Sequence, residues 1–273
     1  MDQIKHDPNI KREIDLETSE YSPRFMQRQF LLIDISNSFV KLALANDTRL
    51  LQKKRLATAD LTSATLQTIT RRWSFTHVVL CSVVPAKKDE VRQAFTQPTL
   101  LLTHQLNLGI GIDYPRPSSI GADRLANAVA AAEIYGGPAV VVDFGTAVTF
   151  DILSREKKYL GGVIAPGLEV MTDYLYDRTA LLPRINLLEP VSAIGRSTRQ
   201  AMLAGAIYGY RGLVKEILAQ IRTQLGEKKI HVIATGGYAS LIAARLPVLK
   251  IVHPDLTLEG LRIIATRNLP SHS

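Results

Sequence analysis

The chain has 273 residues, of which 46% are hydrophobic and 21% are charged, and its formal net charge is +8. This length suits one large domain or two modest ones, and the composition is that of an ordinary globular protein. No apolar stretch approaches the roughly 18 residues of a membrane helix, and residues 1–28 lack the apolar core of a signal peptide. These features predict a cytoplasmic protein without a membrane anchor.

The positive charge raises the question of nucleic acid. The basic residues occur in scattered pairs, with no long run and no stripe interleaved with aromatic residues. This pattern argues against nucleic acid and favours anionic small molecules or simple solubility. The single cysteine, Cys81, stands in an apolar strand-like run, so it forms no disulfide within the chain and fits a reducing compartment.

The first part of the chain begins with a polar segment. Residues 1–28 carry six acidic and five basic side chains, which predicts a poorly ordered N-terminal extension. The stretch 30–44 then has the pattern of a strand ending at Asp34, a small polar turn and a second strand. We expect the first half to be completed by a helix at 58–72, a strand at 77–84, a helix at 87–95 and a strand at 99–103.

A loop rich in glycine and proline covers residues 107–120. A loop of this length inside a compact protein is usually functional. It leads into an alanine-rich stretch from Gly121 to Glu133 that predicts a helix. Asp123 and Arg124 therefore fall in or just before the first turn of that helix.

The second half opens with the same design as the first. A β-branched run at 139–142 ends at Asp143, and Gly145 and Thr146 make a tight polar turn before strands at 150–153 and 159–164. Asp34 and Asp143 are 109 positions apart, a plausible domain length. We therefore expect two related α/β halves that face one another, residues 29–137 and residues 138–273.

The long stretch 198–225 predicts a helix, with Ser197 as its N-cap. One face of it carries Ala201, Gly205, Gly209 and Gly212, and each glycine costs up to about 1 kcal/mol relative to alanine. Close helix packing, either within the chain or across a dimer, would account for these small residues. Other expected elements are helices at 168–175, 238–245 and 256–268 and strands at 230–234 and 248–252.

The acids at the two turns have two interpretations. An aspartate that ends a buried strand beside small polar residues can hold a hydrated cation, while the turn amides and hydroxyls bind phosphate. Alternatively, each aspartate only caps its turn. The occurrence of the arrangement in both halves favours the first interpretation.

Two further features each have two interpretations. Lys41 is either a phosphate ligand or a solvated lysine on an edge strand. Gly236 and Gly237 form either a surface for adenine or an ordinary turn.

Asp123 and Arg124 pair an acid with a cation at a helix start. Arg124 is suited to a substrate carboxylate, and Asp123 to the proton of a substrate hydroxyl. The alternative is that Asp123 only complements the helix dipole. The glycine- and proline-rich loop before it favours a functional role. The chain lacks a Walker P-loop, a protein-kinase signature, a nucleophile elbow and zinc-ligand histidine spacing.

Together these motifs resemble the type III pantothenate kinases, which belong to the superfamily of acetate and sugar kinases, chaperones and actin-like ATPases. The resemblance extends from residue 30 to residue 268 and rests on the segments 34–41, 82–85, 114, 121–124, 143–147, 161–162, 166–167, 179–183 and 198. It implies an α/β fold of two related actin-like (ribonuclease H-like) domains. Each has a mixed central sheet flanked by helices, and the active site lies in the cleft between them.

The resemblance also implies an activity, ATP-dependent phosphorylation of pantothenate to 4'-phosphopantothenate in coenzyme A biosynthesis. It implies Mg2+ with the ATP, a monovalent cation (K+ or NH4+) at Asp143, and a homodimer. Asp123 corresponds to the proton acceptor. The implied ATP contacts are Asp34, Ile35, Ser36, Asn37, Ser38, Phe39, Val40, Lys41 and Thr146. The implied pantothenate contacts are Tyr114, Gly121, Ala122, Asp123, Arg124 and Thr198.

One position departs from the family pattern. Ser36 stands where the family usually has glycine in its first phosphate motif. If that position requires a positive φ, serine would cost about 1 kcal/mol or more and would crowd the phosphate. Two alternatives therefore stay open: a catalytically reduced relative that acts as a regulatory or binding protein, and a kinase for another small hydroxylated substrate.

Overall fold

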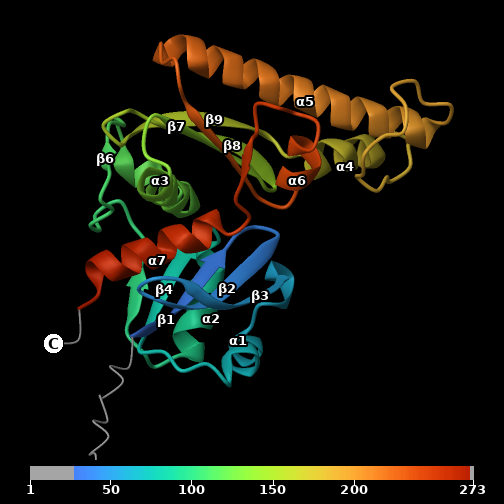
Figure 1. Cartoon of the computed structure of the whole chain (residues 1–273). Helices are drawn as coiled ribbons and strands as arrows, with labels where there is room; N and C mark the ends of the chain where they lie inside the picture. Colours follow the sequence, from blue (N-terminus) through green and yellow to red (C-terminus); the bar gives the residue numbers. More distant parts are fainter. Residues whose placement is uncertain (1–27, 271–273) are drawn as a thin grey trace, which may run out of the picture.

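The computed structural model describes residues 28–270, which form two β-sheets with helices between them and outside them (Figure 1). The first sheet has the strand order β3-β2-β1-β4-β5 and the second the order β11-β10-β7-β8-β9-β6. The strands of the first sheet are β1 (Gln29–Ile35), β2 (Phe39–Asn46), β3 (Leu50–Ala57), β4 (His77–Ser82) and β5 (Thr99–Leu101). Those of the second are β6 (Gly111–Ile112), β7 (Ala139–Phe144), β8 (Ala147–Leu153), β9 (Lys158–Pro166), β10 (His231–Thr235) and β11 (Ile251–Val252).

The two sheets repeat one topology. In the first, β2 is antiparallel to both β1 and β3, while β4 and β5 continue the sheet in parallel with β1. In the second, β8 is antiparallel to both β7 and β9, while β10 and β11 continue in parallel with β7. The prediction of two related α/β halves with mixed sheets is confirmed.

The α-helices form three layers around the two sheets. They are α1 (Ser63–Thr70), α2 (Lys88–Ala94), α3 (Ala122–Ile134), α4 (Leu168–Arg178), α5 (Thr198–Leu225), α6 (Ala239–Ala243) and α7 (Leu256–Asn268), with short 3-10 turns at Thr58–Asp60, Pro85–Lys87 and Pro117–Ser119. Helices α3 and α7 lie between the two sheets (Figure 1). Helices α1 and α2 cover the outer face of the first sheet, and α5 and α6 cover the outer face of the second.

Strand alternation explains these layers. In β1 the side chains of Leu31 and Ile33 point towards α1 and α2, while Phe30 and Leu32 point towards the central helices. Because both faces of the strand are covered, it is apolar throughout. The central helices also approach each other closely: a Cβ on Gly260 of α7 would lie 2.0 Å from the Ala126 carbonyl oxygen of α3. Only glycine fits at that crossing.

Most elements agree with the sequence. The long helix spans Thr198–Leu225, and the Ser197 hydroxyl accepts a hydrogen bond from the Gln200 amide at 3.3 Å, as expected of an N-cap. The last helix also has the predicted bounds. The strand expected at 248–252 is only Ile251–Val252, and part of the loop 107–120 forms β6, which pairs with β9.

The glycine face of α5 packs against nothing within the part of the chain that the structure describes, because no atom lies within 4 Å of a Cβ built on Gly205, Gly209 or Gly212. The prediction that these small residues pack against another helix of the same chain is therefore wrong.

The division 29–137 and 138–273 stays a prediction, although β6 joins the second sheet and α7 packs on β1 of the first. Except for Arg28, the extension 1–28 lies outside the described residues.

Among residues 28–270, no helix combines the length and apolarity that crossing a bilayer requires.

Candidate active site

The two polar turns have the same backbone closure. In the first, the Ser36 amide donates to the Phe39 carbonyl at 3.0 Å. In the second, the Gly145 amide donates to the Ala147 carbonyl at 3.1 Å. Each turn links the first two antiparallel strands of its sheet, so duplication of the topology places the turns at equivalent positions.

The tips of the two turns touch each other. Ser38 Oγ and Thr146 Oγ1 are 2.8 Å apart and share a hydrogen bond. The aspartates that precede these tips, Asp34 and Asp143, are close enough for each charge to act on the other. The sequence prediction that the two halves face one another at these turns is confirmed.

Asp34 is almost fully buried, with 2% of its surface exposed. It stands opposite Lys41 on one neighbouring strand and opposite Cys81 on the other. Its Oδ1 atom is buried without a hydrogen-bond partner. Burial raises the pKa of Asp34 to about 7; Lys41 opposes this rise, and the carboxylates of Asp123 and Asp143 add to it. The site thus gathers three acids, one of which has an unsatisfied oxygen.

Asp143 is held by the helices that lie between the sheets. Asn127 of α3 donates from Nδ2 to Asp143 Oδ2 at 3.0 Å. The Oδ1 atom of Asn127 accepts in turn from the Thr257 hydroxyl of α7 at 2.9 Å. Since both amide groups are used, the orientation of Asn127 and hence of the Asp143 carboxylate is fixed.

The glycine turn after β10 packs directly on Asp143. Gly236 has φ +92°, and a Cβ there would lie 2.5 Å from Asp143 Oδ1. Both observations require glycine at this position. Thr235, opposite Asp143 in the sheet, has a buried hydroxyl oxygen without a partner. This turn therefore belongs to the surroundings of the second aspartate, whether or not it also touches an adenine ring.

Asp123 lies in the first turn of α3, as predicted. Its Oδ1 accepts a hydrogen bond from the Arg124 amide at 2.8 Å, so the carboxylate folds back on the free amides of the helix start. Burial raises the pKa of Asp123, the nearby Asp143 carboxylate raises it further, and the Arg124 amide and charge lower it. A carboxylate in this position is a stronger base than one in water.

The structure adds a residue that the sequence analysis overlooked. Asp151 of β8 is fully buried and accepts a hydrogen bond from Arg124 Nε at 2.6 Å and another from the Tyr159 hydroxyl at 3.0 Å. Burial raises the pKa of Asp151 to about 7, and the Arg124 charge lowers it in part. An acid between Phe150 and Ile152 in an apolar run was the available signal, because a buried charge needs a partner.

Within the stretch 34–41, the side chains face different ways. Ile35 and Val40 are buried in the core against α1 and α2, so only their backbone groups are available to a ligand. Asn37 is exposed. The Phe39 ring is 40% exposed and is covered by the Arg55 guanidinium, whose carbon lies 3.5 Å from the ring centre.

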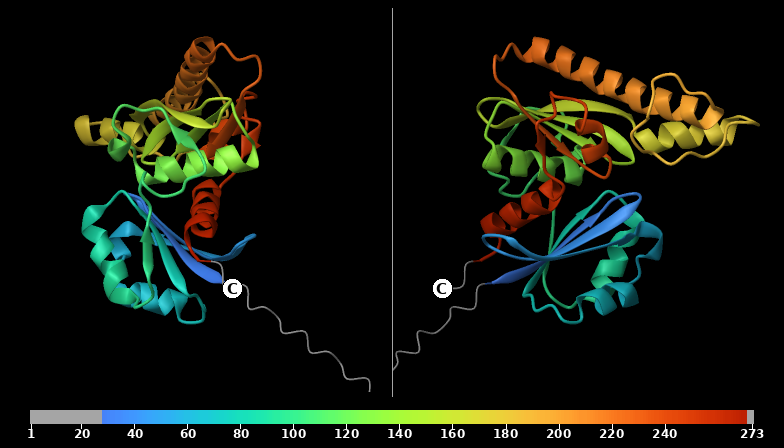
Figure 2. Two further views of the ribbon diagram at one scale, coloured as in Figure 1. Left: turned by 90° about the vertical axis from the view of Figure 1, so that its left-hand side faces the viewer. Right: turned by 45° about the vertical axis from the view of Figure 1, so that its right-hand side comes forward.

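Tyr114 and Thr198 have separate locations. Tyr114 packs edge-on against Tyr159, with ring centres 6.2 Å apart, and thereby stands beside the Arg124 cluster together with Gly121 and Ala122 at the start of α3. Thr198 is exposed at the start of α5, where α4 and the loop after it project past the second sheet (Figures 1 and 2). Within one chain, the structure does not bring Thr198 to the three acids.

The acids fit a hard cation that arrives with a nucleotide. Within residues 28–270, no group of three or more His, Cys, Asp or Glu side chains is arranged to hold a metal ion alone. Magnesium usually binds through one or two carboxylates together with substrate phosphates. The unpartnered Oδ1 of Asp34 is an oxygen ligand of the required kind. The donor set therefore suits magnesium carried by ATP.

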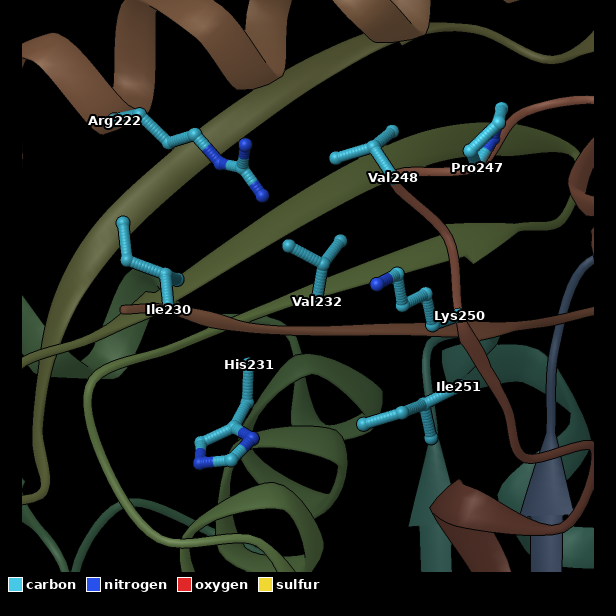
Figure 3. Close-up of a pocket in the computed structure, with 8 residues that line it drawn as sticks. All are labelled: Arg222, Ile230, His231, Val232, Pro247, Val248, Lys250 and Ile251. Carbon is cyan, nitrogen blue, oxygen red and sulfur yellow. The ribbon is translucent and has the colours of Figure 1, made fainter. Parts of the chain in front are cut away.

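A groove of about 540 Å³ lies elsewhere, beside β10, β11 and the C-terminal end of α5 (Figure 3). Its walls include the polar side chains Arg222, His231 and Lys250 and the apolar side chains Ile230 and Val248. None of the predicted site residues lines it. The groove is therefore separate from the chemistry of the two turns.

Known proteins resemble this chain along most of its length. The family model for type III pantothenate kinase matches residues 30–220. A type III pantothenate kinase from Akkermansia muciniphila is 50% identical over 241 residues, which cover 88% of this chain and 99% of that one. Another from Methylacidiphilum infernorum is 42% identical over 235 residues, which cover 86% and 87% of the two chains.

A solved structure agrees on the fold. The ethanolamine utilization protein EutJ from Carboxydothermus hydrogenoformans aligns with a TM-score of 0.50 at 13% identity, over 86% of this chain and 89% of that one. The strand order repeated in both sheets is that of two actin-like, ribonuclease H-like domains. With its family match and its close relatives, the chain belongs to the type III pantothenate kinase family.

Proposed function

We propose that this chain transfers the terminal phosphoryl group of ATP to the primary hydroxyl of pantothenate, and so forms 4'-phosphopantothenate for coenzyme A biosynthesis. The observation that carries the proposal is the convergence of Asp34, Asp123 and Asp143 beside two joined polar turns. Membership of the pantothenate kinase family supports the choice of substrates. The same site geometry would serve a kinase for another small alcohol, which a substrate panel distinguishes.

The two turns would bind the phosphates of ATP. Turn amides and the hydroxyls of Ser38 and Thr146 are donors for phosphate oxygens, and a bound phosphate would replace the hydrogen bond that now joins these hydroxyls. Lys41, opposite Asp34, adds a point charge. Ile35 and Val40 would contribute only backbone groups, because their side chains are buried in the core.

Cations have two roles in this proposal. Magnesium bound with ATP neutralises charge on the terminal phosphates. Asp34, with one carboxylate oxygen unsatisfied, would face that charge. Asp143, fixed by Asn127, would hold the monovalent cation, potassium or ammonium. Turnover that is independent of added potassium and ammonium would contradict this role of Asp143.

Asp123 would accept the proton of the attacking hydroxyl. Phosphoryl transfer passes through a loose transition state, so catalysis depends mainly on positioning and charge neutralisation. Because proton transfer then comes late, a carboxylate with a raised pKa is an adequate base. Tyr114 and the helix start at Gly121, Ala122 and Arg124 would surround the rest of pantothenate.

A homodimer would complete the pocket. The exposed face of α5 carries Gly205, Gly209 and Gly212 with open space in front of each. Large apolar side chains are exposed nearby on the β9 end, α4, the loop after it and α5 itself: Ile164, Tyr174, Leu181, Val191, Ile194 and Tyr208. Burial of such a surface is typical of a subunit interface. A fully active monomer in light scattering would contradict the dimer.

Thr198 gives the dimer a functional reason. It lies at the start of α5 beside this apolar surface and away from the acids of its own chain. A second subunit packed on α5 would bring its own Thr198 towards the first subunit's pantothenate pocket. The cytoplasmic location stays a prediction that no feature of the structure tests.

Ser36 does not favour the reduced-relative alternative. Among residues 28–270, Lys157 is the one non-glycine residue with a positive φ. Ser36 therefore has a negative φ, which is an ordinary backbone conformation for serine. Its amide and carbonyl are both bonded, to Phe39 and to the Thr58 hydroxyl. The expected strain at this position is therefore absent, and the departure from the family pattern leaves the first phosphate turn intact.

The direct test is a coupled kinase assay with ATP, magnesium, potassium and pantothenate. Asp123→Asn should lower kcat by roughly 100-fold or more, because a general base contributes about that much, while the melting temperature stays within a few degrees. Asp60→Asn, a change of an exposed acid in the first half, is the matched control and should leave kcat unchanged. Near-normal turnover of Asp123→Asn would show that Asp123 is not the base.

A further inference from the structure

The guanidinium of Arg124 is held by a hydrogen bond at one of its three nitrogens and enclosed by protein at a second. Nε donates to Asp151 Oδ1 at 2.6 Å. Nη2 is buried without a hydrogen-bond partner and lies 2.3 Å from where a Cβ on Gly162 would be. Glycine at that position therefore leaves the space that the guanidinium fills.

The third nitrogen, Nη1, has a different environment. It has no hydrogen-bond partner among the described residues, and it is absent from the enclosed atoms that include Nη2. The Arg124 side chain as a whole is 15% exposed. The rotation of the guanidinium is thus set by Asp151 and Gly162, and the Nη1 amino group is left for a ligand.

Asp151 does more than neutralise a charge. It lies in the middle strand of three, opposite Val141 on β7 and Gly162 on β9, and none of its surface is exposed. A buried ion pair gains little over well-packed apolar side chains of similar volume, so stability alone gives no reason for an acid here. Its two oxygens accept from Arg124, from Tyr159 and, at 3.5 Å, from Thr149.

Tyr159 links this acid to the predicted substrate pocket. Its hydroxyl donates to Asp151, and burial raises its pKa so that the hydroxyl keeps its proton. Its ring packs against Tyr114 and lies 5.8 Å from the guanidinium carbon of Arg124. One network therefore orients both Arg124 and Tyr114.

We infer that Asp151 is a positioning residue that holds Arg124, with help from Tyr159, so that Nη1 binds the carboxylate of pantothenate. The inference rests on the proposed function, because pantothenate supplies the carboxylate. The contact differs from the two parallel hydrogen bonds that arginine often makes with a carboxylate, since Nε is occupied by Asp151 and Nη2 is enclosed. The network selects a substrate with a negative charge at the end opposite to the reacting hydroxyl.

The test compares pantothenate with its alcohol analogue, in which a hydroxymethyl group replaces the carboxylate. Asp151→Asn keeps the shape of the side chain but loses the charge that orients Arg124. We expect the KM for pantothenate to rise roughly 10- to 100-fold, the range of a weakened charge-assisted contact, with kcat within about 3-fold of wild type. For the alcohol, measured as substrate or as competitive inhibitor, the affinity should change less than about 3-fold.

Two further variants guard against misfolding and general damage. Tyr159→Phe removes one hydrogen bond to Asp151 and keeps the ring, so it should raise the KM for pantothenate by a smaller factor, roughly 3- to 10-fold. Glu133→Gln changes an acid at the far end of α3, where it pairs with Arg267 at 2.9 Å, and should leave both constants unchanged.

The outcomes separate the two proposals. If the wild type does not phosphorylate pantothenate, the proposed function fails. Suppose that the wild type is active but that Asp151→Asn and Tyr159→Phe weaken the binding of the alcohol and of pantothenate equally, or lower only kcat. Asp151 is then not a positioning residue for the carboxylate. Unchanged constants for both variants would overturn the inference as well.

Discussion

The two aspartate turns occupy equivalent positions in the duplicated topology, but their carboxylates differ in burial and in hydrogen-bond partners. Asp34 is buried, and one of its oxygens has no partner. Asp143 is partly exposed and accepts a hydrogen bond from Asn127. The same strand-turn-strand unit thus carries an unsatisfied acid in one half and an acid already held in the other.

The difference follows from which elements reach each turn. The helices between the sheets supply Asn127 and Thr257 to the second turn. In the first turn, Asp34 lies between Lys41 and Cys81 of its own sheet and interacts with both, but its Oδ1 is left without a hydrogen-bond partner. A buried and unsatisfied acid costs stability in the free protein, which is typical of functional sites that a ligand completes.

The largest effect is expected for Asp34→Asn. The pKa of Asp34 is about 7 in the folded protein and 3.8 in an unperturbed aspartate, the value that we take for the unfolded chain. Between pH 3.8 and pH 7 the folded state therefore binds more protons than the unfolded state. The contribution of Asp34 to stability should therefore fall as the pH rises from 4 to 7. At pH 8 the variant should be more stable by roughly 2–4 kcal/mol, at about 1.36 kcal/mol for each pKa unit. Urea unfolding without nucleotide, at several pH values, measures this.

The same substitution should lower turnover roughly 100-fold or more, because a group that faces developing charge is lost. Asp143→Asn is the matched comparison, and it should gain less stability because Asp143 is partly exposed and hydrogen-bonded. Equal gains for the two variants, or none for Asp34→Asn, would remove the contrast between the turns.

Much of this fold is encoded in local patterns. Both strand-turn-strand units, the N-cap at Ser197 and the bounds of α5 and α7 are predictable, because each depends on neighbouring residues along the chain. Strand β6 is not predictable in this way, because two residues carry no periodic signal and only the edge of β9 makes them a strand.

In the candidate site, too, some residues could be predicted from local sequence patterns and their distant partners could not. Asp34, Asp143 and Asp123 are recognisable from the sequence, since each lies near the end of a strand or at the start of a helix. The partners that define their chemistry come from far along the chain: Thr257 joins Asn127 across 130 positions, and Ser38 joins Thr146 across 108. Such contacts follow from the stacking of the two sheets, which no local pattern specifies.

A smaller effect is expected for Asn127→Ala. The change removes the donor to Asp143 and leaves the buried Thr257 hydroxyl without its acceptor, which should cost about 1–3 kcal/mol of stability. If Asp143 holds the monovalent cation, the potassium concentration for half-maximal turnover should also rise. Thr257→Val, which leaves the bond to Asp143 in place, is the control and should alter stability with little change in the potassium response. An unchanged potassium response in Asn127→Ala would separate Asp143 from the cation.

The smallest effect is expected where the turns are most alike. Ser36 and Gly145 both have ordinary backbone angles, and a Cβ on Gly145 would lie 3.5 Å from its nearest atom, an ordinary contact. Ser36→Gly should therefore lower stability by about 0.5–1 kcal/mol through added freedom of the unfolded chain. Gly145→Ser should leave stability within about 1 kcal/mol of wild type, because the backbone and the space at this position accept a side chain and the unfolded chain loses some freedom. Thermal unfolding of both variants measures this, and turnover of Ser36→Gly should stay within about 2-fold. A marked gain in turnover on Ser36→Gly would mean that the serine hydroxyl crowds the phosphate, even though its backbone is unstrained.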